Sequence, residues 1–179
     1  VPDHDSYSET INQILERLKP GKVEKVVLSR SHHVKIAESF SVVSGMQVLR
    51  NAYPKCMSFF FSFPNEGIFF GSTPERLIRL NNKSIETEAL AGTISRGKNM
   101  EEDRLLADKL RGSHKEGEEH RFVLEQILRK LKPLTNQLDF ADYPEILKLK
   151  NVQHLKTPIF GELESKQHIL DLVKQLHPT

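Results

Sequence analysis

Apolar side chains recur every three or four residues in five stretches of the chain, the spacing at which a helix buries one face. In the last stretch, Leu172, Val173 and Leu176 share one side of a helix. Pro133 follows the fourth stretch, where a helix must end. The spacing predicts helices over residues 6–19, 41–52, 101–110, 115–131 and 167–176.

Runs of β-branched and aromatic residues between these helices favour strands. Two pairs of runs are separated by short polar segments and predict hairpins, and a polar loop is expected over 92–100. Helices inserted among hairpin-linked strands predict an α+β fold with antiparallel sheets. The predicted strands cover 23–36, 56–63, 68–71, 75–80, 84–91 and one or two segments within 146–163.

The segment Phe59-Phe60-Phe61-Ser62-Phe63 places four phenylalanines in the first predicted hairpin. Such a run could form a binding surface. Aromatic strands are far more often part of a hydrophobic core. We therefore predict that these rings are buried in the core.

The composition of the chain excludes several classes of function. The chain has 179 residues, 37% of them hydrophobic and 28% charged, which suits a folded domain rather than a disordered segment. The formal net charge is +2 and basic residues alternate with acidic ones, so we expect no nucleic-acid partner. No apolar run reaches the roughly 18 residues of a membrane span, and no signal-peptide pattern starts at Val1. We expect a cytoplasmic protein without a membrane partner. Cys56 is the single cysteine, which excludes an internal disulfide.

Lys25 is a candidate general base. In a strand it shares one face with Val23 and Val27, while Val26 and Leu28 occupy the other. A desolvated ammonium group loses its proton more readily and can then act as a base. The alternative is a lysine at a sheet edge that reaches solvent.

Glu75 is a candidate general acid. It follows Pro74, whose missing N–H suits the start of a strand. A glutamate held against an apolar hairpin tends to stay protonated, as a general acid requires. The alternative is a solvent-facing carboxylate on a strand.

Small and polar residues later in the chain are candidates for ligand binding. The turn Ala91-Gly92-Thr93 can bring backbone N–H groups close to a ligand, because glycine leaves no side chain in the way. The alternative is an ordinary turn. His154 and Thr157 flank two residues of the late strand region. The alternative for His154 is a hydrogen-bonded histidine in the core or at its rim.

An acidic half-helix offers a candidate metal ligand. Glu116 and Glu119 are three residues apart and share a helix face. Glu119 also lies one turn before Val123, at the edge of the apolar side, where a carboxylate can bind a hard cation such as Mg²⁺. The alternative is acidic residues that stabilise the start of a helix through its dipole.

Six segments, in this order, closely resemble motifs of the chorismate-utilising enzymes, the family of anthranilate synthase component I, and within it the isochorismate synthases. The resemblance covers nearly the whole chain. It implies an α+β fold with large antiparallel sheets and flanking helices, of which residues 1–179 would be part of a single chorismate-binding domain. The segments are Lys25 to Arg30, Gly71 to Glu75, Glu88 to Thr93, Glu119-His120, His154 to Thr157 and Leu176 to Thr179.

The resemblance also implies chorismate as the small-molecule substrate and Mg²⁺ as the cofactor. Lys25 would activate water, which adds at C2 of chorismate, and Glu75 would protonate the departing C4 hydroxyl. Water is the expected nucleophile, because Ala91 stands where aminodeoxychorismate synthases carry a nucleophilic lysine. Glu119 would bind the metal, and the substrate-binding residues would be Ala91, Gly92, Thr93, His154 and Thr157.

We expect the sequence to be a piece of a longer protein, because Val1 is not an initiating methionine and no terminal tail follows Thr179. Members of the family continue into a segment with a second metal-binding glutamate and basic residues for the substrate carboxylates. Those residues would then lie outside this chain, as would an N-terminal portion of the domain.

Other functions stay open. A salicylate synthase would share the lysine and then eliminate pyruvate. A non-catalytic module could keep the fold, although the presence of both Lys25 and Glu75 argues against it. The form of Glu88-Ala89-Leu90-Ala91 favours menaquinone biosynthesis over siderophore biosynthesis. The sequence does not indicate an oligomeric state.

Overall fold

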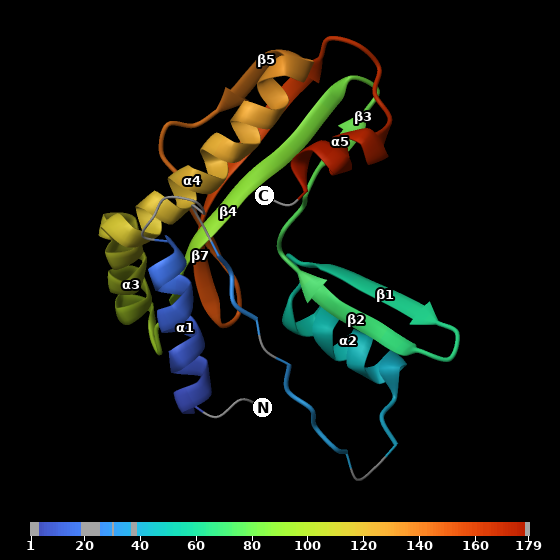
Figure 1. Ribbon diagram of the computed structural model, residues 1–179, viewed down its shortest axis with the longest axis vertical. Helices are drawn as coiled ribbons and strands as arrows, with labels where there is room; N and C mark the ends of the chain where they lie inside the picture. The colour runs from blue at the N-terminus through green and yellow to red at the C-terminus, as the bar shows by residue number, and fades with distance from the viewer. Residues whose placement is uncertain (1–3, 19–25, 30, 37–38, 178–179) are drawn as a thin grey trace. The chain divides into compact units, whose positions relative to one another are not determined.

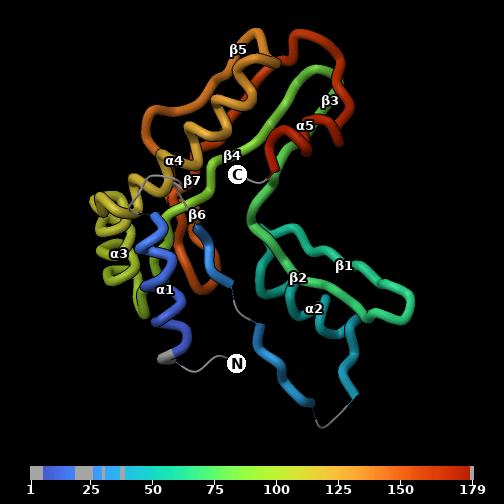
Figure 2. The backbone as a smooth tube through the Cα atoms, viewed as in Figure 1, coloured from blue at the N-terminus to red at the C-terminus, as the bar shows by residue number. Residues whose placement is uncertain are grey.

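The computed structural model describes residues 4–18, 26–29, 31–36 and 39–177. Contacts divide the chain into two compact units, Val1–Ser41 and Val42–Thr179. The first unit contains α1, His4–Leu18, in agreement with the predicted first helix. Figure 2 traces the backbone of both units from end to end. That the whole chain belongs to one domain stays a prediction.

The strand predicted over 23–36 is wrong for its described residues. Residues 26–29 and 31–36 have no regular secondary structure and pair with no strand in the described part of the chain. Val27 is 79% exposed and Val34 is 70% exposed. β-branched residues favour strands only where a neighbouring strand and a packed face are available. Among the described residues of the first unit, neither is present for this segment.

A two-stranded antiparallel hairpin and one helix open the second unit. α2 covers Val42–Ala52, β1 covers Met57–Phe63 and β2 covers Gly67–Thr73, as the sequence predicts. α2 packs against the hairpin (Figure 1). Asn65 has a φ of 63°, which fits a tight turn between the strands.

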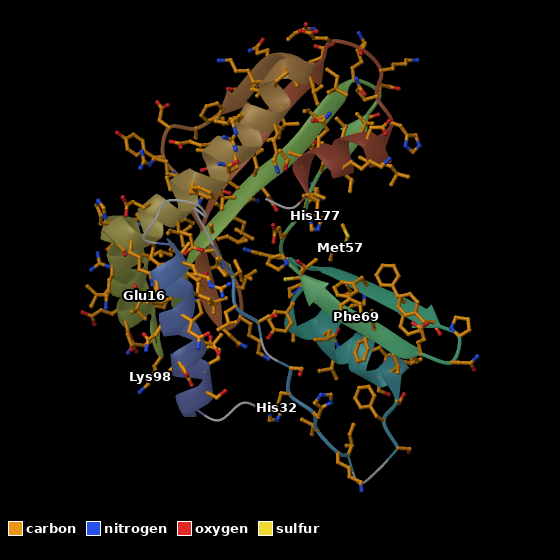
Figure 3. The ribbon with its side chains drawn as sticks, in the orientation of Figure 1. Glu16, His32, Met57, Phe69, Lys98 and His177 are labelled. Carbon is orange, nitrogen blue, oxygen red and sulfur yellow. The ribbon has the colours of Figure 1, made fainter. Side chains whose placement is uncertain are left out.

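The prediction that the phenylalanine run is buried in the core is wrong for most of its rings. Phe60, Phe61 and Phe63 are between 48% and 54% exposed. Met57 and Phe69 lie on the same hairpin (Figure 3) and are 58% and 60% exposed. The rings pack mainly on one another, with the Phe59 and Phe69 centroids 5.2 Å apart. Phe61, Phe63 and Phe69 lie on one face of the hairpin and Phe60 on the other, so the described residues leave aromatic rings exposed on both faces.

The larger sheet of the second unit has five antiparallel strands. Its order is β3-β4-β7-β5, and β6 also pairs with β7. The long strands β4 and β7 lie side by side along most of their length (Figure 1). This antiparallel sheet and its helices confirm the predicted α+β class. The strands are β3 Arg79–Asn81, β4 Ser84–Ser95, β5 Thr135–Phe140, β6 Glu145–Lys148 and β7 Val152–Leu163.

Two consecutive helices follow β4. α3 covers Met100–Gly112 and α4 covers His114–Leu131, which confirms the predicted break between them. Ser113 forms that break, because its N–H bonds to the Leu110 carbonyl and its hydroxyl accepts a bond from the Glu116 N–H. The short 3₁₀ helix η1, Lys132–Leu134, leads into β5. After β5, β6 and β7, the last described helix is α5, Ile169–Leu176.

The hydrophobic core lies between the larger sheet and the helices α4 and α5. Side chains alternate along a strand, so β4 and β7 each bury one face and leave the other partly exposed. We call the partly exposed face, which carries Glu88, His154 and Lys156, the outer face. No described helix is long and apolar enough to cross a membrane. The core residues are Ile85, Ala89, Ile127, Leu131, Ile159, Leu163, Leu172 and Leu176.

Candidate active site

A β-bulge at Gly92 is the central feature of the site. Ala91 pairs with Leu155, Thr93 pairs with His154, and the register shifts between the two pairs. Gly92 is the extra residue and has a φ of 79°, which L side chains rarely adopt. The predicted turn at 91–93 is therefore a bulge within a strand, and β4 continues to Ser95 instead of ending at Ala91.

The bulge holds Thr93 between two neighbours. The Thr93 N–H donates to Glu116 Oε2 at 2.9 Å. The Thr93 hydroxyl lies 2.9 Å from His154 Nδ1. Thr93 itself is exposed, so this pair lies where a ligand can reach it. The fold thus brings together two predicted substrate-binding residues that are far apart in the sequence.

His120 fixes the bulge from the buried side. Its Nδ1 is 3.2 Å from the Ala91 carbonyl oxygen, and its Nε2 is 2.8 Å from the Thr157 hydroxyl. Since a carbonyl can only accept, Nδ1 carries the proton and Nε2 accepts from Thr157. Burial lowers the pKa of His120, and the bond to Ala91 offsets this only in part. His120 is therefore a neutral link between α4 and the two long strands.

His154 and Thr157 lie on opposite faces of β7, because they are three residues apart in a strand. Thr157 is fully buried, and its hydroxyl points toward His120. His154 is on the outer face, and burial lowers its pKa while a hydrogen bond to the Gly92 backbone partly opposes this. The structure therefore places His154, but not Thr157, beside Thr93. A substrate contact by Thr157 stays a prediction.

Glu75 lies in the loop between β2 and β3, and its side chain is exposed. The prediction that it begins a strand against an apolar hairpin is wrong, because β3 starts only at Arg79. The Glu75 N–H donates to the Thr73 hydroxyl at 3.2 Å. Glu75, Glu88 and Ile127 line the same small pocket. The loop thus presents a carboxylate that an external molecule can reach.

Glu119 is exposed on α4, one turn after Glu116. Its carboxylate oxygens are the donors that Mg²⁺ prefers, so the residue type fits the cofactor. Within the described residues, no three His, Cys, Asp or Glu side chains are arranged to hold a metal ion. Glu119 can therefore supply part of a magnesium site, with other ligands such as water or substrate oxygens completing it.

All of the chain, residues 1–179, matches a family described as chorismate binding enzyme. The chain belongs to the chorismate-binding enzymes. This agrees with the resemblance of its motifs. It also gives the β4 bulge a functional context, because the bulge residues are among those that resemble the family's substrate-binding segments.

Two curated relatives illustrate the similarity to other chorismate-binding enzymes. The chain is 32% identical over 178 residues to isochorismate synthase MenF of Escherichia coli, covering 99% of this chain and 41% of the relative. It is 34% identical over 175 residues to the salicylate biosynthesis isochorismate synthase of Pseudomonas aeruginosa, covering 97% of this chain and 36% of the relative. The chain thus spans about two fifths of the length of these curated relatives.

A solved structure supports the fold. The crystal structure of DhbC from Bacillus anthracis, assigned as a 2,3-dihydroxybenzoate-specific isochorismate synthase, is 29% identical and superposes with a TM-score of 0.94. The match covers 99% of this chain and 49% of the DhbC chain. The arrangement of helices and antiparallel strands is therefore that of a chorismate-binding enzyme.

A buried ionic cluster fixes the chain that follows the bulge. Asp103, on α3, accepts from Arg96 Nε at 2.6 Å, from Lys148 Nζ at 2.7 Å and from the Gly97 N–H at 3.0 Å. The bonds from Arg96, Lys148 and Gly97 hold the pKa of Asp103 well below its usual range. Gln153, on β7, also donates to Asp103 Oδ1 at 3.3 Å. The cluster joins β4, α3, β6 and β7 beside the site.

Sequence reasoning missed His120, Glu88 and Lys156 as parts of the site. Lys156 Nζ is 3.0 Å from Glu88 Oε2 on the outer face. Such a cross-strand pair depends on the strand register, which the sequence alone does not give. The position of His120 directly after Glu119, within a resembling segment, was the available signal for that residue. Lys25 lies outside the described residues, so its role as a base stays a prediction.

Proposed function

We propose that the protein converts chorismate to isochorismate. The observation that carries the proposal is the bulge of β4, which brings Thr93 and His154 together in a chain whose relatives are named isochorismate synthases. Because the chain spans about two fifths of those relatives, the activity is proposed for the full-length protein rather than for these residues alone.

In the proposed reaction, Lys25 takes a proton from a water molecule, which adds at C2 of chorismate. Glu75 gives its proton to the C4 hydroxyl, which leaves as water while the ring double bonds shift. One water is gained and one is lost, so the product is an isomer of the substrate. Glu75 is exposed in the loop before β3, so its carboxyl group is accessible to a leaving group bound there.

The bulge region is proposed to orient the substrate. The Thr93 hydroxyl and the neutral His154 ring offer hydrogen bonds on the outer face. Ala91 and Gly92 are proposed to contact the substrate through their backbone, and Thr157 would act from behind through His120. A bound Mg²⁺ would supply positive charge for the substrate carboxylate, and Glu119 is the residue proposed to bind it. Such positioning makes acid–base groups effective.

Water is the proposed nucleophile because Ala91 has no reactive group. The pathway is proposed to be menaquinone biosynthesis, from the form of residues 88–91 and the 32% identity to MenF of E. coli. The DhbC relative carries a name linked to 2,3-dihydroxybenzoate, so siderophore biosynthesis is the alternative destination. We propose the cytoplasm as the location of the enzyme.

The test is product analysis with the full-length protein, chorismate and Mg²⁺. Isochorismate as the single product, lost on addition of EDTA and restored by excess Mg²⁺, would support the proposal. Salicylate together with pyruvate would instead identify a salicylate synthase. Chorismate binding without turnover would identify a non-catalytic module and overturn the proposal.

A further inference from the structure

We propose that Glu88 and Lys156 are positioning residues that hold the Glu75 loop in place for proton transfer. The inference rests on the proposed function, in which Glu75 is the proton donor. Neither residue contacts the reacting atoms in this proposal. Both act through the backbone of the residue that follows Glu75.

The contacts form a continuous link from the sheet to the loop. Lys156 Nζ is 3.0 Å from Glu88 Oε2. The other oxygen, Glu88 Oε1, accepts from the Arg76 backbone N–H at 3.3 Å. One carboxylate thus holds a lysine with one oxygen and the loop backbone with the other.

Strand register determines where the link begins. Lys156 pairs with Leu90 across β4 and β7, which places it diagonally opposite Glu88 on the outer face. The side chains of Lys156 and Glu88 are only 23% and 14% exposed, so solvent screens the pair less than a surface ion pair. Glu145 also approaches Lys156, but at 3.8 Å and with 60% of its side chain exposed. Glu88 is therefore the main partner of Lys156.

A second bond attaches the same loop to the same strand. The Thr87 hydroxyl donates to the Leu77 carbonyl at 2.7 Å. Adjacent residues of β4, Thr87 and Glu88, thus bind the loop on its carbonyl and N–H sides. Of these two attachments, the bond from Glu88 to Arg76 is the nearer to Glu75 along the chain. Loss of the Glu88 bond would free the peptide next to the proton donor while Thr87 still holds the rest of the loop.

The two carboxylate oxygens of Glu88 explain why Lys156 matters. Lys156 gives Glu88 Oε2 a charged partner, and such charge-assisted bonds are stronger than bonds between neutral groups. Without Lys156, Glu88 is free to rotate toward solvent and release the Arg76 N–H. A displacement of about 1 Å at a catalytic group can cost roughly a hundred-fold in rate. We therefore expect a loss in kcat of roughly ten- to hundred-fold with little change in KM.

The first experiment compares single variants of the full-length protein by steady-state kinetics and thermal melting. Lys156→Met and Glu88→Ala are expected to lower kcat, while Lys156→Arg recovers most of the rate because it keeps the ion pair. Glu88→Gln keeps an acceptor for the Arg76 N–H. It takes the place of Glu88→Ala in the kinetic comparison if Glu88→Ala folds poorly. Equal kcat and KM for wild type, Lys156→Met and Glu88→Ala would overturn the inference.

Glu86→Gln is the matched control. Glu86 lies two residues before Glu88 on β4 and contacts the same arginine, but through the Arg76 side chain at 3.4 Å rather than its backbone. Its side chain is 37% exposed. Its removal is expected to leave kcat within about twofold of wild type, since exposed ion pairs at this distance contribute little. A loss of kcat equal to that of Glu88→Ala would mean that surface charge in general, and not the bond from Glu88 to the Arg76 backbone, controls the rate.

The decisive experiment is a double-mutant cycle with Glu75→Gln. If Glu88 acts through Glu75, adding Glu88→Ala to Glu75→Gln causes no further loss of the residual rate. Multiplicative losses would show that Glu88 acts by another route and would overturn the inference. Hydrogen exchange at the Arg76 amide gives a readout that does not need activity, and Glu88→Ala should accelerate it at least tenfold while distant amides stay unchanged.

These outcomes separate the inference from the proposed function. A wild-type protein that forms no isochorismate refutes the proposed function, whatever the Arg76 amide does. An active wild type with a strongly impaired Glu75→Gln variant, but with fully active Glu88→Ala and unchanged exchange at Arg76, refutes only the inference.

Discussion

Replacing Gly92 by alanine tests whether the β4 bulge needs its left-handed backbone. At a φ of 79° a side chain costs about 1–2 kcal/mol. A Cβ added there would lie 3.0 Å from the Glu116 carbonyl oxygen and 3.2 Å from Leu155 Cδ1, which is closer than normal packing allows. Relieving these close contacts costs about 1–3 kcal/mol more. Gly92→Ala should therefore destabilise the protein by about 2–5 kcal/mol.

The assay is thermal unfolding of the full-length protein, followed by calorimetry or circular dichroism. A loss of this size lowers the Tm by roughly 2–4 °C for each kcal/mol in a domain of this size. Gly117→Ala is the matched control, because Gly117 is helical and no atom lies within 4 Å of an added Cβ. That change should stabilise α4 by about 0.5–1 kcal/mol. A Gly92→Ala protein that melts with the wild type would refute the reasoning from the bulge.

Three further predictions concern single side chains. Lys25→Gln should lower isochorismate formation by roughly a hundred-fold or more with an unchanged Tm, and near-normal turnover would eliminate Lys25 as the base. Glu75→Gln should lower the rate in both directions to a small residual value while chorismate still binds in calorimetry; weaker binding with normal turnover at saturation would make Glu75 a binding residue. Asp103 has a lowered pKa when folded, so its stabilising contribution is present above a pH of about 4 and is lost as the pH falls below that. The Tm difference between wild type and Asp103→Asn should therefore shrink on acidification, and a constant difference would contradict this.

Local patterns predicted the elements that carry their own signals. The helices α3 and α4 and the break between them followed from apolar spacing. The β1–β2 hairpin followed from two aromatic runs around a short polar turn. In contrast, β5 was missed, because its sequence TNQLDF is mostly polar and follows a proline. It pairs with β7 as a strand of the larger sheet, which only the tertiary fold determines.

Long-range geometry limited the prediction of the site. Motif resemblance identified Thr93 and His154, and the fold places them in contact. The three-residue spacing of His154 and Thr157 in a strand puts Thr157 on the face opposite His154, but that the Thr157 face is the one buried against α4 depends on the tertiary fold. The Phe61 and Phe63 rings show the same limit, since strand propensity does not determine which face of a hairpin other segments cover.

Ser113 has a consequence for how this region can change in evolution. Ser113 ends α3 and begins α4 without an intervening loop. The start of α4 is therefore fixed relative to the end of α3. One residue inserted in the first turn of α4, between Ser113 and Glu116, would turn the rest of that helix by about 100° relative to its start. Glu116 and His120 would then leave Thr93 and Ala91, while Asp103 kept its place. Chorismate-binding enzymes that share this junction should therefore tolerate substitutions around it far better than insertions or deletions.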